Sequence, residues 1–251
     1  MGAGPGRTPI EQSKETVATF AFIHGAGDVG WYWHLVESDL RTRGHDTVAP
    51  DLPCGDDSAG VAEYADTIAA AVGDRSDIVV VAHSAGGLTA PLVCERVAVE
   101  LLVLVAPMIP TAGEAPGDYF TNTRLGDEKR THHDDVVALF YHDVPPELAA
   151  QAVAKGRDES EARAEEPTPM RAWPDVPTRV LICREDRVFP AAYLRRVVTE
   201  RLGITPDEMD GGHTPALSRP LDLADRLHTF AAEQCLAPAS VGQENGGQVL
   251  P

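Results

Sequence analysis

Short runs of apolar residues alternate along the chain with segments whose apolar residues recur every three or four positions. The apolar runs predict strands over residues 17–23, 47–49, 78–82, 101–106 and 179–183. Helical spacing predicts helices over residues 31–43, 61–72, 86–97, 191–202 and 221–232. Continuously apolar strands are typical of a parallel sheet that helices cover on both faces. The alternation therefore predicts an α/β fold, doubly wound around a mostly parallel sheet.

One long segment, residues 111–172, interrupts this alternation. It is charged and contains several prolines, with helical pieces near residues 134–141 and 145–155 but no apolar strand. An insertion of this length above a sheet is usually a lid over a site. We therefore predict one domain over residues 16–235 that carries a helical lid insertion.

The two ends of the chain have a different composition from the rest. Residues 1–15 and 236–251 are rich in glycine, proline and polar residues, which predicts disordered tails. The N-terminal tail lacks the apolar stretch of a signal peptide, and no apolar run is long enough to span a membrane. We therefore expect a cytoplasmic protein without a membrane partner.

Composition and charge narrow the class of protein. The 251 residues are 43% hydrophobic, which is enough for one sizeable core, and the net charge is −18. Such acidity disfavours nucleic acid as a partner and mildly favours neutral or cationic substrates over anionic ones. The four cysteines (Cys54, Cys94, Cys183 and Cys235) are scattered without metal-ligand spacing, which favours reduced thiols. Oligomeric state stays open.

A serine ends the apolar part of the stretch IVVVAHSAGGL, residues 78–88. Ala82 and Gly86 flank Ser84 at two positions on either side, and small residues there permit a tight strand-to-helix turn that exposes the hydroxyl. Such turns usually have glycine at both positions, so Ala82 is a departure. The glycine and lysine pattern of a phosphate-binding loop is absent. A nucleophile and a purely structural turn remain as alternatives.

A serine nucleophile needs a base, and the base needs an acid that orients it. His213 lies in the loop GGHTP before the last predicted helix, and Asp186 lies in REDRVFP after a predicted strand. Both follow the carboxyl ends of elements, where open α/β sheets place their sites, and the order serine, acid, histidine suits such a turn. Glu185 is a rival acid, but Asp186 has the better offset from the strand. Taken alone, His213 has the alternative of a surface-loop histidine, and Asp186 that of a helix cap or a solvated charge. Together with Ser84 they favour catalysis.

The sequence HGAG, residues 24–27, follows the first predicted strand. Its small residues let the backbone approach a substrate oxygen, so the N–H groups of Ala26 and Ala85 are the predicted oxyanion donors. A simple turn is the alternative, and His24 is expected to pack under the loop. The candidate residues for the substrate pocket are Gly25, Trp31 and His83.

Histidines gather in the predicted lid. His132, His133, His142 and Asp143 do not have the spacing of metal ligands, so we expect them to be solvated or to pack within the lid. Neither a metal nor an organic cofactor is predicted.

Together these motifs resemble the α/β-hydrolase superfamily, and most closely the branch of plant methylesterases (salicylate-binding type) and hydroxynitrile lyases. The stretches that carry the resemblance are FIHGAGDVGWYWHLVESDLRTRGH, APDLP, VVVAHSAGGL, ICREDRVFP and GGHTPALSRP. The resemblance implies the α/β-hydrolase fold, a nucleophile at Ser84, an acid at Asp186 and a base at His213. It places the oxyanion loop at Gly25 and Ala26.

Four positions depart from relatives of this fold. The lyases carry a threonine and a lysine where this chain has Gly25 and Thr214, and without the lysine no cation stabilises departing cyanide. The branch often has an aspartate before the catalytic histidine, and Gly212 in its place is expected to loosen the base loop. Epoxide hydrolases and dehalogenases of this fold use an aspartate nucleophile, where this chain has Ser84.

The sequence predicts a serine hydrolase that cleaves a small carboxylic ester or lactone through an acyl-enzyme. One alternative is a ligand-binding, receptor-like protein with the same residues. Another is a tailoring enzyme that performs acyl transfer, cyclisation or lyase chemistry in the same pocket.

Overall fold

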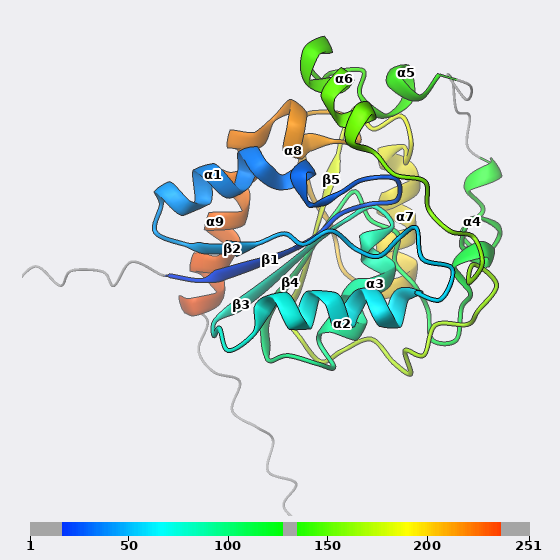
Figure 1. Cartoon of the computed structure of the whole chain (residues 1–251), viewed down its shortest axis with the longest axis horizontal. Coiled ribbons are helices and arrows are strands. Elements are labelled where there is room, and N and C mark those ends of the chain that lie inside the picture. The colour runs from blue at the N-terminus through cyan, green and yellow to red at the C-terminus, as the bar shows by residue number, and fades with distance from the viewer. Residues whose placement is uncertain (1–16, 128–134, 237–251) are drawn as a thin grey trace, which may run out of the picture.

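Within the described part of the chain, six parallel strands form one sheet in the order β2-β1-β3-β4-β5-β6 (Figure 1). The computed structural model describes residues 17–127 and 135–236. The strands are β1 (Thr19–Ile23), β2 (Asp46–Val48), β3 (Ile78–His83), β4 (Val99–Val105), β5 (Thr178–Cys183) and β6 (Asp207–Met209). Strand order reverses beside β1, because the chain leaves β1 for β2 and returns to β3 on its other side. Open α/β sheets hold their sites at such a reversal.

Helices cover both faces of the sheet, as the sequence predicts (Figure 1). One face is covered by α2 (Val61–Val72), α3 (Gly86–Val93) and α7 (Ala191–Leu202). The other is covered by the 3-10 helix η1 (Gly30–Trp33), α1 (His34–Thr42), α8 (Pro215–Ser218) and α9 (Pro220–Leu236). Within β3, Val80 and Ala82 enter the first core, and Val79 and Val81 enter the second. Burial on both faces is why the strand is apolar throughout.

The structure differs from the prediction at the edge of the sheet and at helix ends. The edge strand β6 has the sequence DEM and pairs with β5, with Asp207 opposite Leu181. It was not predicted, because an edge strand of three residues needs no apolar run. The helix predicted from residue 31 begins as the 3-10 turn η1, and the helix predicted to residue 97 ends at Val93.

The segment between β4 and β5 has helices but no strand within its described residues. These helices are η2 (Pro116–Asp118), α4 (Tyr119–Asn122), η3 (Leu125–Asp127), α5 (Val136–Phe140) and α6 (Pro146–Lys155). Figure 1 shows α5 and α6 together at one end of the molecule, with α4 apart from them. A buried ion pair of 2.6 Å between Glu114 and Arg201 joins the start of the segment to α7. The predicted tails lie almost wholly outside the described residues.

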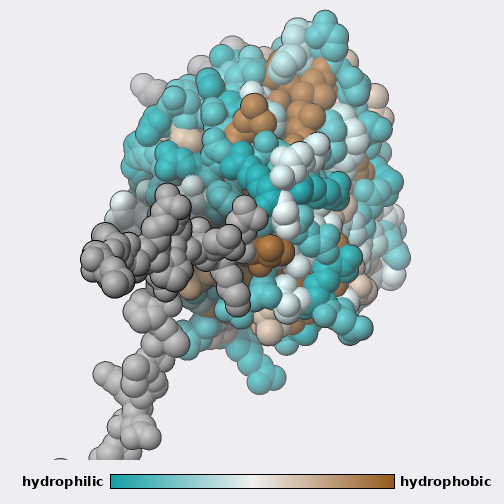
Figure 2. Space-filling view, turned by 90° about the vertical axis from the view of Figure 1, so that its left-hand side faces the viewer, coloured by the Kyte–Doolittle hydropathy of each residue, from teal (hydrophilic) through white to brown (hydrophobic). Residues whose placement is uncertain are grey.

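The described surface is mostly hydrophilic. Seen from the side on which α1 lies, hydrophilic residues cover most of the described surface, and apolar residues gather in a few smaller areas (Figure 2). In the described ranges no helix is long and apolar enough to cross a bilayer.

Candidate active site

Ser84 lies on a strained turn between β3 and α3. Its φ is +50°, in the left-handed region that residues other than glycine rarely adopt. Its N–H donates to the carbonyl of Val105 (3.1 Å), and its own carbonyl accepts from the N–H of Gly87 (3.0 Å). A Cβ atom on Gly86 would lie 2.7 Å from the carbonyl oxygen of His24, which explains the glycine there. The small residues after the serine therefore serve close backbone packing.

Ala82 occupies the position where such turns usually have glycine. It is fully buried in the core between the sheet and α2, α3 and α7, and it pairs with Ile23 of β1. The fold therefore accommodates the extra methyl group inside the core.

The structure brings Ser84, His213 and Asp186 into one hydrogen-bonded chain. The Nε2 atom of His213 lies 3.0 Å from Oγ of Ser84, and its Nδ1 atom lies 2.9 Å from Oδ2 of Asp186. Oδ1 of Asp186 accepts from the N–H groups of Val188 and Phe189 at 2.8 and 2.9 Å. These bonds fix the carboxylate, which favours the tautomer of His213 that donates from Nδ1 and accepts from the serine hydroxyl.

Glu185, the alternative candidate for the acid, bonds to the backbone of the base loop and not to the ring of His213. One of its carboxylate oxygens accepts from the backbone N–H of Gly211, in the loop before His213. Glu185 therefore holds the base loop, whereas Asp186 contacts the base itself.

His83 contacts His213 and is absent from the wall of the substrate cavity described below, contrary to the expectation. Its Nε2 donates to the carbonyl oxygen of His213 (2.8 Å), and the two rings lie 4.9 Å apart. Burial lowers the pKa of His83 well below its usual range, and the neighbouring His213 adds to that shift. A neutral His83 can donate this one hydrogen bond without placing a second charge beside the base.

The two predicted oxyanion donors lie on neighbouring loops. Among the described residues, the backbone N–H groups of Ala26 and Ala85 donate no hydrogen bond to the protein, and both residues line the same cavity. His24 fastens the first loop, since its Nδ1 donates to the carbonyl of Gly25 (2.9 Å) and its Nε2 accepts from the N–H of Leu52 (3.0 Å). Two unpartnered donors beside a nucleophile are suited to bind an oxyanion.

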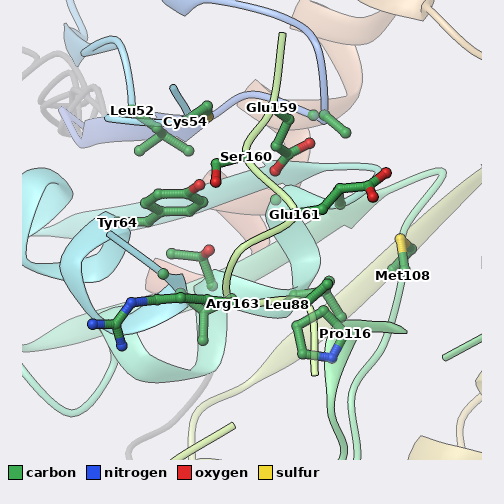
Figure 3. Close-up of a pocket in the computed structure, with 18 of the residues that line it drawn as sticks. Leu52, Cys54, Tyr64, Leu88, Met108, Pro116, Glu159, Ser160, Glu161 and Arg163 are labelled. Atoms are coloured by element: carbon green, nitrogen blue, oxygen red, sulfur yellow. The ribbon is translucent and has the colours of Figure 1, made fainter. Parts of the chain in front are cut away.

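A cavity of about 320 Å³ opens beside these donors (Figure 3). Gly25, Ala26 and Ala85 line it on the side of Ser84. Its apolar wall consists of Leu52, Ala59, Val61, Leu88, Met108, Pro116 and Phe120. The volume and the apolar lining are typical of sites for small molecules.

Two carboxylates, those of Glu159 and Glu161, line the cavity, and neither forms an ion pair with another described residue. Glu159, from the stretch after α6, lines the cavity with Tyr64 (Figure 3), and burial raises its pKa. Its neighbouring arginines are used elsewhere, because Arg157 pairs with Asp51 and Arg163 pairs with Glu166. The cavity therefore disfavours an anionic group.

Trp31 does not line this cavity, although the sequence suggested it as a pocket residue. Its ring stacks on the ring of His34 at 4.3 Å, and the ammonium group of Lys155 lies 5.2 Å from its centroid. Its neighbours Tyr32 and Trp33 are buried in the core on the α1 face. The aromatic cluster therefore anchors the start of α1.

Asp28 is a site residue that the sequence analysis missed. Burial raises the pKa of its carboxyl to about 7, although the charge of His213 opposes the shift. Burial raises the pKa values of Tyr32 and Tyr141, and the charge of Asp28 adds to both shifts, so its carboxyl is electrostatically coupled to the two phenols and to the base. Tyr32 lies four residues after Asp28 and was the one neighbour near it in sequence, whereas Tyr141 and His213 come from distant parts of the chain.

The structure also shows where the lid histidines, Asp143 and the cysteines lie. Among the described residues, no cluster of histidine, cysteine, aspartate or glutamate is arranged to hold a metal ion. His142 contacts Glu185 in the acid loop, Asp143 contacts the loop that carries His213, and His132 and His133 lie outside the described residues. All four cysteines are free.

Comparison with known sequences decides the family. A profile of the alpha/beta hydrolase family matches residues 20–226, which include the turn at Ser84, the acid loop and the base loop. The chain belongs to the alpha/beta hydrolase family.

Individual esterases are similar to this chain in sequence or in structure, in agreement with the resemblance seen in its motifs. A probable esterase of Oryza sativa subsp. japonica is 27% identical over 85% of this chain and 97% of its own length. A methyl jasmonate esterase of Vitis vinifera is 25% identical over 83% of this chain and 94% of its own. The crystal structure of polyneuridine aldehyde esterase superposes with a TM-score of 0.70 at 18% identity, covering 85% of this chain and 99% of that one.

Proposed function

We propose that the protein is a serine hydrolase that cleaves a small carboxylic ester or lactone through an acyl-enzyme. The hydrogen-bonded chain from Ser84 through His213 to Asp186, beside a small cavity with two free backbone donors, carries this proposal. The esterase names of the rice and grape relatives support an ester as the substrate.

The first half-reaction transfers the acyl group to the serine. His213 takes the hydroxyl proton on Nε2 while Oγ of Ser84 bonds to the carbonyl carbon. The carbonyl oxygen becomes an oxyanion, which the N–H groups of Ala26 and Ala85 hold. Each such donor typically stabilises the transition state by about 3 kcal/mol. The carbonyl re-forms, the bond to the leaving oxygen breaks, and that oxygen takes the proton from Nε2.

The second half-reaction uses water in the same way. His213 removes a proton from water, whose oxygen attacks the acyl carbon, and the proton then passes to Oγ of Ser84 as the ester bond breaks. In both halves Asp186 holds the imidazole and stabilises its positive charge. With a lactone the leaving alcohol stays attached to the acyl group, and a hydroxy acid is released.

The cavity indicates the kind of acyl or alcohol group that fits. Its apolar wall suits an alkyl or ring group, and its volume of about 320 Å³ limits the substrate to a small molecule. The unpaired carboxylate of Glu159 makes a neutral group preferable to an anionic one.

A panel of p-nitrophenyl esters, methyl esters and lactones, hydrolysed in water enriched in oxygen-18, tests the proposal. We expect multiple turnovers and one heavy oxygen in each released acid. Transfer of the acyl group to an added alcohol without heavy oxygen would favour a tailoring enzyme. Binding with at most a single turnover would favour a receptor-like protein.

A further inference from the structure

The last residue of α5 and the residues that follow it contact both sides of the loop that carries His213. Oδ2 of Asp143 accepts from the N–H of Gly212 (2.7 Å), directly before the base. The hydroxyl of Thr214, directly after the base, donates to the carbonyl of Phe140 (2.8 Å). The ring of Phe140 also meets the ring of His213 edge-on at 5.4 Å. A segment more than sixty residues away in sequence therefore brackets the base.

Gly212 is a glycine because this contact leaves no room for a side chain. A Cβ atom there would lie 2.6 Å from both Oδ1 of Asp143 and Nε2 of His142. The adjacent Gly211 has a φ of +117° and needs glycine for its conformation, whereas Gly212 lies outside that left-handed region. The cost of a side chain at position 212 is therefore steric, and it comes from these two neighbours.

His142, the neighbour of Asp143, contacts the loop that carries the acid. Its Nε2 lies 3.0 Å from the carbonyl oxygen of Glu185, the residue before Asp186. His142 and Asp143 thus touch both the loop of the acid and the loop of the base. Asp143 thus holds the N–H at Gly212, the position where the sequence analysis expected a looser base loop.

The loop needs such an anchor, because two successive glycines leave its backbone with many accessible conformations. Catalysis requires Nε2 of His213 to stay within hydrogen-bond reach of Ser84 while Nδ1 keeps its bond to Asp186. A displacement of about 1 Å at a reacting group can lower a rate by about 100-fold.

We propose that Asp143 is a positioning residue, which fixes His213 against Ser84 by accepting the N–H of Gly212, with His142 seated beside it. This inference rests on the proposed hydrolase function. It assigns the segment between β4 and β5 a part in catalysis besides its place near the cavity. Asp143 touches neither the serine nor the substrate cavity, so its effect passes entirely through the base loop.

The test compares Asp143→Ala, Asp143→Asn and the control Glu147→Ala, an exposed carboxylate of α6 in the same segment. Two readouts are used: kcat and KM for p-nitrophenyl butyrate, and the rate at which a fluorophosphonate labels Ser84. We expect Asp143→Ala to lower kcat and the labelling rate by about 10- to 100-fold with KM nearly unchanged. Asp143→Asn keeps an acceptor for Gly212 and is expected to stay within about threefold of the parent protein. Glu147→Ala is expected to match the parent.

Gly212→Ala provides a second test in case Asp143→Ala fails to fold. Its methyl group would displace Asp143 and His142 without altering either, so it is expected to lower kcat and labelling similarly. In the variant Gly212→Ala with Asp143→Ala, the loss is expected to be smaller than the product of the two single losses, because both act on one contact.

The outcomes separate this inference from the proposed function. A parent protein that neither labels nor hydrolyses the ester would contradict the proposed function itself. An active parent whose Asp143→Ala or Gly212→Ala variant keeps the full rate overturns the positioning role. A loss in Asp143→Asn as large as in Asp143→Ala, or a loss confined to KM, overturns it as well.

Discussion

The Nδ1 atom of His213 lies 2.9 Å from Oδ2 of Asp186, and both side chains are almost completely shielded from solvent. The other oxygen of this carboxylate is held by two backbone N–H groups, from Val188 and Phe189. The turn after β5 therefore holds the acid independently of the base loop. A carboxylate held in this way has one oxygen, Oδ2, directed at the imidazole, because Oδ1 is occupied by the two backbone N–H groups.

Asp186→Asn is expected to lower kcat by about 10,000-fold with little change in fold. Asparagine can still accept the two backbone N–H groups, but its amide N–H would face Nδ1 and favour the wrong tautomer of His213. Steady-state kinetics with a p-nitrophenyl ester measures the change. Glu185→Gln is the matched control, since it keeps an acceptor for Gly211 and is expected to retain most of the activity. Equal losses in both variants would contradict the assignment of the acid.

Asp28 is expected to make the protein less stable as pH rises towards 8. Its pKa is about 7 in the folded protein against 3.8 ordinarily, so the folded state binds more protons between these values. The stability it contributes is present at low pH and is lost as pH rises through about 7. Asp28→Asn cannot ionise, so urea unfolding at about pH 5 and about pH 8 should show a smaller loss of stability in this variant. An identical loss in both proteins would mean that Asp28 does not titrate in this range.

The buried ion pair between Glu114 and Arg201 is expected to matter for stability. Both side chains are largely buried, at 3% and 10% exposure, and Arg201 makes two hydrogen bonds to the carboxylate. Glu114→Ala leaves the guanidinium buried without its partner, which typically costs about 3–5 kcal/mol. Denaturant unfolding measures this cost. Glu166→Ala breaks the exposed pair with Arg163 and is expected to cost about 1 kcal/mol or less.

Charge at the cavity is expected to select among substrates. Glu159 disfavours an anionic acyl group, so p-nitrophenyl hexanoate should be hydrolysed with a higher kcat/KM than the p-nitrophenyl half-ester of adipic acid. In Glu159→Gln we expect this preference to narrow by about fivefold, which corresponds to about 1 kcal/mol of charge repulsion. Glu165→Gln, a carboxylate of the same stretch that does not line the cavity, is the control. An unchanged preference in Glu159→Gln would show that its carboxylate does not face the substrate.

Local chemistry explains what the sequence could predict. Ser84 was identifiable because a buried strand, a serine between small residues and a helix follow one another within a few positions. Asp186 and His213 lie far apart, yet Asp186 follows a predicted strand and His213 lies in a glycine-flanked loop before the last predicted helix, and open α/β sheets place their sites at such element ends. The sheet was predictable because its inner strands are buried on both faces and are apolar throughout.

Long-range packing explains what the sequence could not predict. Trp31 and His83 looked like pocket residues, but the environment of an aromatic ring depends on which distant side chains pack on it. The strand β6 was missed because its residues Asp207 and Glu208 need no burial at the sheet edge. The contact between Asp143 and Gly212 joins two loops whose separate sequences contain no sign of one another.

The mass of the intact protein after reaction with a fluorophosphonate tests the central claim most directly. The parent protein is expected to gain the mass of one phosphonyl group, and a digest should place it on Ser84. Ser84→Ala is expected to keep the fold, to gain no mass and to hydrolyse no ester. A parent protein that stays unlabelled, or a Ser84→Ala variant that still labels or turns over esters at the parent rate, would contradict the account.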